Sequence, residues 1–258
     1  MRRLLRRASA VATRQERDSL GVVEVPAEAY WGAQTQRSLH NFNIGERMPF
    51  ELIRALVLVK KACARVNARY GLEPKVATAI EQACDDVLVG RIGVDQFPLV
   101  VYQTGSGTQT NMNVNEVLAN RATELRGGHR GEKGVHPNDH VNRSMSSNDT
   151  FPTAMHVAAV LGAQEHLMPA LSGLAVALRT KAKEFEKVVK VGRTHTQDAT
   201  PITLGQEFGG YAAQVENGRS AVAATLEGVR QLAQGGTAVG TGLNCFEGFD
   251  AAVSAELN

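Results

Sequence analysis

The chain has 258 residues, 28 lysines and arginines against 26 aspartates and glutamates, and 43% hydrophobic residues. This length can bury a substantial core, and the composition excludes a disordered or low-complexity protein. No uninterrupted apolar run approaches the roughly 18 residues of a membrane-spanning helix. Three scattered cysteines are too few for a disulfide framework or a zinc site. We therefore expect a soluble globular protein of a reducing compartment, without a membrane partner.

The net charge of +2 is unevenly distributed along the chain. Residues 1–15 contain five arginines and no acid, whereas the remainder holds 23 bases and 26 acids, a net charge of −3. A mildly acidic body without a basic stripe predicts no nucleic-acid partner. Residues 1–15 form either a short mitochondrial presequence or a solvated basic tail. We expect a cytoplasmic protein, with the mitochondrial matrix as the alternative if this leader is a presequence.

The sequence of the first half of the chain predicts turns followed by helices. Turn-forming residues dominate 18–43, with a possible strand at Val22–Val25. Apolar residues at spacings of three and four then predict helices. Three are expected: one from Pro49 to a stop at Tyr70-Gly71, one from Pro74 to Val89, and one that follows Thr108 and ends at Gly127-Gly128.

The second half contains two long helical patterns. An apolar stripe runs from Phe151 to Phe185, about 50 Å of helix, and Pro169 should kink it. A loop at Gly192–Pro201 leads to a second long helix, expected from Thr203 to Gln234. Long helices of this kind bury too little alone, so they predict a helical bundle that is oligomeric.

Polar clusters interrupt these helices at their ends, where free backbone N–H groups bind carboxylates or phosphates. They are Thr104–Gln109, His136–Asp139, Ser146–Asn148 and Gly192–Asp198. Each also has a plain structural interpretation: a flexible turn at the first, a helix N-cap at Ser146–Asn148, and a surface histidine at His195. His136 and His140 have the spacing of two metal ligands on a helix, but Pro137 and the lack of a third ligand argue against a metal.

Five motifs in order carry a family resemblance. They are GSGTQ at 105–109, NMNVNEVLANR at 111–121, HPND at 136–139, SSND at 146–149 and GRTHTQD at 192–198. From about Arg17 to Asn244 the chain resembles the class II fumarases of the fumarase/aspartase superfamily. Aspartase-like ammonia lyases typically carry other residues at four of these places, including Gln where His195 stands, and remain the alternative.

The resemblance implies a mainly α fold of the fumarase/aspartase type. An N-terminal mixed domain, residues 16–146, would be followed by the first long helices of a central helical bundle, residues 147–258, with the bundle incomplete. Members of this family form homotetramers whose active sites are shared between subunits, which implies the same for this chain.

The resemblance also implies an activity, the reversible hydration of fumarate to L-malate in the tricarboxylic acid cycle, with no metal and no cofactor. His195 would be the catalytic residue that handles the proton on the hydroxyl side. The substrate-binding residues would be Ser106, Thr108, Ser146, Ser147, Asn148 and Thr194. A second anion site, a short non-standard helical turn, would be formed by His136, Pro137, Asn138 and Asp139.

One signature of the family is not found in the sequence. The loop Gly-Ser-Ser-x-Met-Pro-Gly-Lys-x-Asn, which supplies the serine base in fumarases, does not occur within the 258 residues. We therefore expect a C-terminally truncated chain that is inactive alone and tends to aggregate. The alternative is a non-catalytic helical fragment that exists as such and associates with intact subunits.

Overall fold

The computed structural model describes residues 12–258. These residues divide into two compact units: unit 1 is the chain up to Met155 together with Leu232–Asn258, and unit 2 is His156–Gln231. Most of the expected leader, residues 1–11, lies outside the described residues, whereas its last residues belong to the first strand. No helix within 12–258 is both long and apolar enough to cross a membrane.

Unit 1 begins with an antiparallel hairpin of β1 (Thr13–Asp18) and β2 (Gly21–Pro26). The strand expected at Val22–Val25 is therefore confirmed. Arg14 fastens the hairpin to the following chain: its guanidinium pairs with Glu16 at 2.6 Å and donates to four backbone carbonyls between residues 26 and 31. Arg14 is thus an internal structural residue of this unit.

Helix α1 (Ala33–Asn41) replaces the turns expected in residues 18–43, so that part of the prediction was wrong. The buried carboxylate of Glu116 accepts from the backbone N–H groups of Gly32, Gln34 and Thr35 and from the Thr35 hydroxyl, at 2.6–3.1 Å. A negative charge at a helix N-terminus accepts hydrogen bonds from the free N–H groups and interacts favourably with the positive end of the helix dipole. Burial raises the pKa of Glu116, against the effect of these donors.

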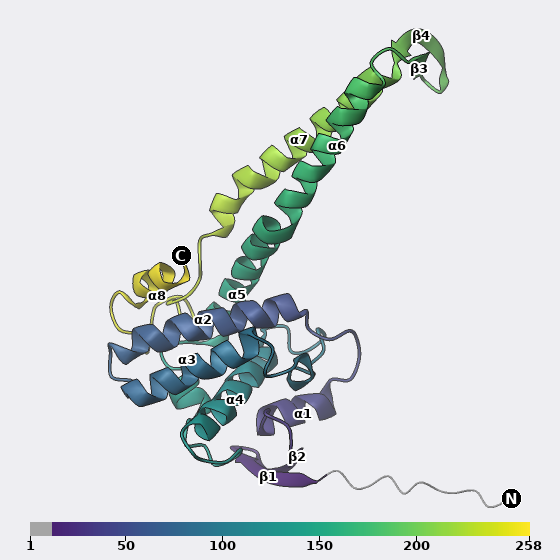
Figure 1. The fold of residues 1–258 in the computed structure, drawn as a ribbon. Coiled ribbons are helices and arrows are strands. Elements are labelled where there is room, and N and C mark those ends of the chain that lie inside the picture. Colours follow the sequence, from purple (N-terminus) through teal and green to yellow (C-terminus); the bar gives the residue numbers. More distant parts are fainter. Residues whose placement is uncertain (1–11) are drawn as a thin grey trace, which may run out of the picture. The chain divides into compact units, whose positions relative to one another are not determined.

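Three further helices form the core of unit 1 and confirm the prediction. They are α2 (Phe50–Ala68), α3 (Pro74–Leu88) and α4 (Thr108–Leu125), with a short 3₁₀ turn at Val94–Gln96. Their apolar faces are fully buried at Leu56, Ile80 and Leu118, and the helices lie against one another in Figure 1. This packing holds α4 in place, and with it the helix start at Thr108.

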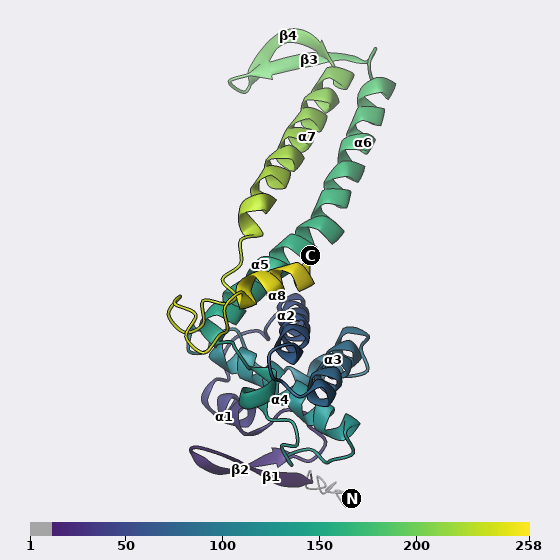
Figure 2. The same ribbon diagram turned by 90° about the vertical axis from the view of Figure 1, so that its left-hand side faces the viewer.

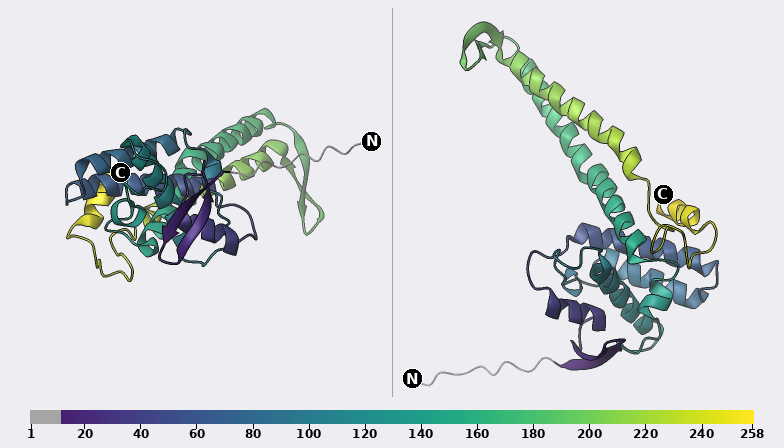
Figure 3. Two further views of the ribbon diagram at one scale, coloured as in Figure 1. Left: turned by 90° about the horizontal axis from the view of Figure 1, so that it is seen from below. Right: turned by 180° about the vertical axis from the view of Figure 1, so that it is seen from behind.

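Helix α8 (Phe249–Leu257) closes unit 1 and was not predicted from the sequence. It packs on α2, as the two views of Figure 3 show. The rings of Tyr70 and Phe246 stack with centroids 3.5 Å apart, and Glu256 pairs with Arg65 and Arg69. The chain after Leu232 is therefore part of the same core as the N-terminal helices.

The long helical stripe after Ser146 is confirmed, although it is interrupted. Helix α5 (Ser147–Gly162) continues through a π-helical turn at Ala163–Leu167 into α6 (Met168–Glu184). The irregular turn ends two residues before Pro169, which has no N–H to donate to the preceding turn and whose ring crowds it. The kink expected at Pro169 stays a prediction.

Unit 2 contains a hairpin where the sequence predicted a loop. Strands β3 (Val189–Thr194) and β4 (Gln197–Thr203) pair antiparallel, with Thr194 opposite Gln197. The loop prediction for Gly192–Pro201 was therefore wrong. The two turn residues, His195 and Thr196, both have positive φ, 48° and 63°. This geometry gives the two-residue turn that matches the twist of a hairpin.

The second long helix, α7 (Leu204–Val229), begins where it was expected and ends five residues earlier. Thr203 and Gln206 form a reciprocal capping box at its start, with distances of 2.9 and 3.1 Å. Figure 2 shows α6 and α7 side by side, with the β3–β4 hairpin joining their ends. Unit 2 is thus a pair of antiparallel helices that carries a hairpin at one end.

Candidate functional site

Two helix starts meet in unit 1. Gly107, with φ of 72°, precedes the first residue of α4, and Ser146 caps α5. The Ser146 hydroxyl accepts from the N–H of Asn148 at 3.2 Å, while the Asp149 carboxylate accepts from the N–H of Ser146 at 2.9 Å. The N-cap predicted at Ser146–Asn148 is therefore present, and it is reciprocal.

A line of hydroxyl groups joins these two helix starts. The oxygen of Thr108 lies 3.0 Å from that of Ser106 and 2.8 Å from that of Ser147 on α5. Gly107 permits this approach, because a Cβ at this position would overlap the ring of Phe151. Three of the residues expected to bind substrate are thus in hydrogen-bond contact.

A cavity of about 360 Å³ opens at this junction. Its walls contain Thr108, Ser146 and Ser147, together with Asn111 and Asn142. Hydroxyls, amides and the free N–H groups of two helix starts are donors suited to a carboxylate. Among residues 12–258, no ionised side chain lines this cavity, so its recognition of an anion rests on neutral donors and on the helix termini.

The opposite wall of this cavity comes from residues 237–244, which follow α7. The side chain of Asn148 donates to the carbonyl of Ala238 at 2.8 Å. The buried Asp149 carboxylate accepts from the N–H groups of Gly235 and Thr237 at 3.1 and 2.9 Å, and from the Gln234 amide at 3.3 Å. Asp149 therefore ties the returning chain to the helix start that carries the candidate site.

The non-standard helical turn that the resemblance implied at the second anion site is present, and the site's role stays a prediction. Pro137–Val141 forms a π-helical turn, a non-standard helix, and His136 caps it by accepting from the N–H groups of Asn138 and Asp139 at 3.3 and 3.2 Å. Nδ1 of His140 in turn accepts from the backbone N–H of His136 at 2.9 Å. Burial lowers the pKa of His140, which favours this neutral acceptor role.

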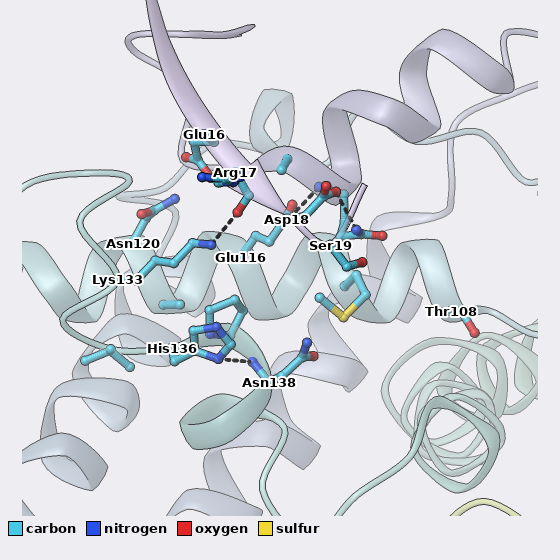
Figure 4. A pocket seen from close by; sticks show the side chains of 16 residues that line it. Glu16, Arg17, Asp18, Ser19, Thr108, Glu116, Asn120, Lys133, His136 and Asn138 are labelled. Atoms are coloured by element: carbon cyan, nitrogen blue, oxygen red, sulfur yellow. Dashed lines mark hydrogen bonds between the residues drawn. The ribbon is translucent and has the colours of Figure 1, made fainter. Parts of the chain in front are cut away.

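His136 and Asn138 face a second cavity, of about 560 Å³. Figure 4 shows their side chains opposite Lys133, whose ammonium donates to the carbonyl of Arg17 at 2.6 Å. Thr108 lies at the edge of the same cavity. The two predicted binding regions, the helix starts and the π-helical turn, are therefore neighbours within unit 1.

Thr194 and His195 belong to unit 2, at the turn of the β3–β4 hairpin. Both are exposed, and the Thr196 hydroxyl donates to the carbonyl of His195 at 2.6 Å. Unit 1 thus carries every predicted binding residue except Thr194, and unit 2 carries Thr194 and the predicted catalytic residue.

Four residues near the cavity were given no site role from the sequence: Asn111, although it begins a recognised motif, and Asn142, Thr237 and Lys60. Asn142 lies between two recognised motifs, and Thr237 lies three residues after Gln234, the expected end of the second long helix. The position of Lys60 in the sequence could have marked it as unusual. It is a charged residue on the apolar stripe of α2, four positions after Leu56, where the pattern calls for an apolar side chain.

The metal alternative gains no support from the geometry. Within residues 12–258, no group of three or more His, Cys, Asp and Glu side chains is arranged to hold a metal ion. The His136 ring, one of the two candidate ligands, accepts from the backbone of its own turn.

Residues 21–258 match the family model described as lyase, and the chain belongs to this family. It is 62% identical over 261 residues to the mitochondrial fumarate hydratase of Rhizopus oryzae, an alignment that covers 99% of this chain and 53% of that protein. It is 59% identical to fumarate hydratase 2 of Arabidopsis thaliana, with 98% and 51% covered.

The fold is likewise that of a fumarase. The crystal structure of class II fumarase from Schistosoma mansoni superimposes with a TM-score of 0.93 at 46% identity, covering 95% of this chain and 52% of that one. The expected mainly α, fumarase-like fold and the family resemblance are confirmed. The chain spans about half the length of the curated relatives it matches.

Proposed function

We propose that the chain supplies the substrate-binding half of an enzyme that reversibly hydrates fumarate to L-malate. The observation that carries the proposal is the contact of the Thr108 and Ser147 hydroxyls, 2.8 Å apart at two helix starts beside a cavity. Fumarate hydratases at about 60% identity support the choice of substrate.

In this proposal neutral donors clamp the dicarboxylate. Ser106, Thr108, Ser146, Ser147 and Asn148 hold one carboxylate at the meeting point of α4 and α5. Thr194 completes the clamp, and His195 takes the proton from the attacking water in hydration and returns it to the departing hydroxyl in the reverse reaction. Donors aimed at the carboxylate also stabilise the extra negative charge of the aci-carboxylate intermediate. His136–Asp139 binds an anion outside the reacting centre.

As the family resemblance implies, we propose a homotetramer in which subunits contribute groups to one another's sites. The 258 residues contain no copy of the serine-base signature, so we propose that they do not turn over fumarate by themselves. We further propose residues 16–146 and 147–258 as the two functional domains, with 1–15 as a basic leader. We place the protein in the cytoplasm, or in the mitochondrial matrix if that leader is a presequence; mitochondrial names among the relatives favour the second location.

A chimera tests this function directly. Residues 1–258 replace the matching half of the Rhizopus oryzae fumarate hydratase, so that the remainder of the enzyme is supplied by a 62% identical relative. Loss of fumarate absorbance, with L-malate as the product, supports the proposal. A soluble tetrameric chimera that adds ammonia to fumarate, but not water, would favour the ammonia lyase instead. The 258-residue chain assayed in parallel should show no turnover.

A further inference from the structure

Lys60 is a buried cation beside the candidate site. It lies on α2, its side chain is fully buried, and it is one of the largest side chains in the core. Its ammonium donates to Oδ1 of Asn142 at 2.6 Å and lies 3.7 Å from the sulfur of Met145. Both of these residues line the 360 Å³ cavity that contains Thr108 and Ser147. Lys60 does not itself line that cavity, and its ammonium contacts the wall through Asn142 and Met145.

Asn142 links this cation to the first of the two helix starts. Its Oδ1 also accepts from the side-chain amides of Asn111 and Asn115, at 3.2 and 3.3 Å, from two positions one turn apart on α4. Its own amide donates to the carbonyl of Met145 at 3.3 Å, one residue before the Ser146 cap. Four donor–acceptor contacts thus connect Lys60, α4 and the segment that leads into α5.

No carboxylate within residues 12–258 forms an ion pair with Lys60. The ionisable groups that act on it are the thiol of Cys63 on its own helix, the thiol of Cys84 on α3, and the carboxylate of Asp149 at the start of α5. Burial raises the pKa of both thiols, which keeps them neutral, and the backbone donors described above hold the Asp149 carboxylate elsewhere. Glu256 on α8 is engaged by Arg65 and Arg69.

A buried charge without a partner is costly to the fold, and an anion brought close to it reduces that cost. The cavity wall otherwise offers an anion only neutral donors and helix termini. Resting on the function proposed above, we propose that Lys60 is a positioning residue. It holds Asn142 and the Ser146 segment in place and supplies the positive potential by which the cavity prefers a doubly charged dicarboxylate to a singly charged one.

Two inhibitors that share the succinyl skeleton and differ in charge test this inference in the chimera. Succinate is a dianion and monomethyl succinate a monoanion at neutral pH, and neither has the double bond that is hydrated. The quantity measured is the ratio of their inhibition constants. In Lys60→Met the preference for succinate should fall by about tenfold, because Coulomb attraction scales with the charge of the ligand. A purely structural role would weaken both inhibitors equally and leave the ratio unchanged.

Lys61→Met is the matched control. This neighbouring lysine carries the same charge, but it pairs with Asp85 at 2.5 Å, away from the cavity, so its variant should keep the parent's ratio. Lys60→Gln is the second neutral variant and should behave as Lys60→Met does. It decides the outcome if Lys60→Met does not give soluble protein.

The results separate the two proposals. An unchanged inhibitor ratio in a neutral Lys60 variant of a chimera that hydrates fumarate overturns the inference about Lys60 alone. A parent chimera that is folded but neither hydrates fumarate nor binds succinate counts against the proposed function.

Discussion

The hydroxyl oxygens of Thr108 and Ser147 lie 2.8 Å apart although 39 positions separate the two residues in the chain. One is the first residue of α4 and the other the first residue of α5, so two sets of free backbone N–H groups point to one place. The candidate site therefore forms only where α4 and α5 pack together. Each of the two hydroxyl groups can be removed separately by substitution.

Thr108→Val and Ser147→Ala should each raise the KM of the chimera for fumarate by about tenfold, since each removes one donor to a carboxylate. The double variant should lose less than the product of the two effects, because the hydroxyls also orient each other. Steady-state kinetics of the four proteins give the coupling. Thr78→Val, whose hydroxyl bonds only within α3, should leave KM unchanged. Strictly multiplicative effects would show that the contact does not matter for binding.

Gly107→Ala should destabilise the 258-residue chain by about 2–4 kcal/mol, because the new Cβ meets the Phe151 ring and the backbone has φ of 72°. Gly105→Ala separates these causes, since Gly105 also has positive φ but nothing lies within 4 Å of its Cβ position. That variant should lose only about 1 kcal/mol. Urea denaturation followed by circular dichroism measures both. Equal losses would mean that the contact with Phe151 contributes nothing.

Asp149→Asn should destabilise the chain by about 2–3 kcal/mol. The amide that replaces one carboxylate oxygen brings N–H donors toward the N–H groups of Gly235 or Ser146, and the charge on these hydrogen bonds is lost. Urea denaturation gives the change, with Asp85→Asn as the control, because the Asp85 side chain is 51% exposed and its variant should cost under about 1 kcal/mol. A loss no larger than that of the control would contradict the role given to Asp149.

Lys60 should also leave a signature in the pH dependence of stability. Burial lowers the pKa of Lys60 from 10.5 to about 8. Between these values the unfolded chain binds more protons than the folded one, so this residue makes stability rise with pH, by up to about 3 kcal/mol. Below pH 8 the full cost of the buried charge is present. Unfolding free energies of the parent should therefore approach those of Lys60→Met as pH rises from 8 to 10.5; a constant difference would contradict this.

His195→Asn should reduce kcat of the chimera sharply, by at least about a hundredfold, if this imidazole moves the proton at the hydroxyl side. A variant in the second anion site is the comparison: Asp139→Asn should retain most turnover, because the Asp139 side chain is 76% exposed and does not line the cavity of Thr108 and Ser147. Both are followed as loss of fumarate absorbance. Near-normal turnover of the His195 variant would remove this residue from the proposed mechanism.

The helices with a regular apolar stripe could be predicted from the sequence, and those held by tertiary contacts could not. Helices α2, α3 and α4 follow the expected bounds to within a few residues. Helix α1 has the polar sequence AQTQRSLHN, and its start is held by Glu116, 81 or more positions away. No local pattern contains that information. The β3–β4 hairpin was missed because its turn uses His195 and Thr196 in a conformation that sequence rules reserve for glycine and asparagine.

In the candidate site, too, the residues could be predicted from sequence motifs but their tertiary contacts could not. Motif resemblance located its hydroxyl and amide residues, and the roles assigned to them remain predictions. Their contacts were not foreseeable: the Thr108–Ser147 pair depends on how α4 and α5 pack, and Asn142 gathers three donors from two helices. Spacing along one element reveals which residues share a face, but not which residue of another element meets them.

The two ends of unit 2 lie together. Nδ1 of His156 is 2.7 Å from the carbonyl oxygen of Gln231, so the chain enters and leaves this unit at one point, and Asp149 fastens the returning chain a few residues later. In topological terms, the helical pair with its hairpin is an insertion in unit 1. A short linker from Met155 to Leu232 could replace all 76 residues of the insertion without altering the order of the remaining elements.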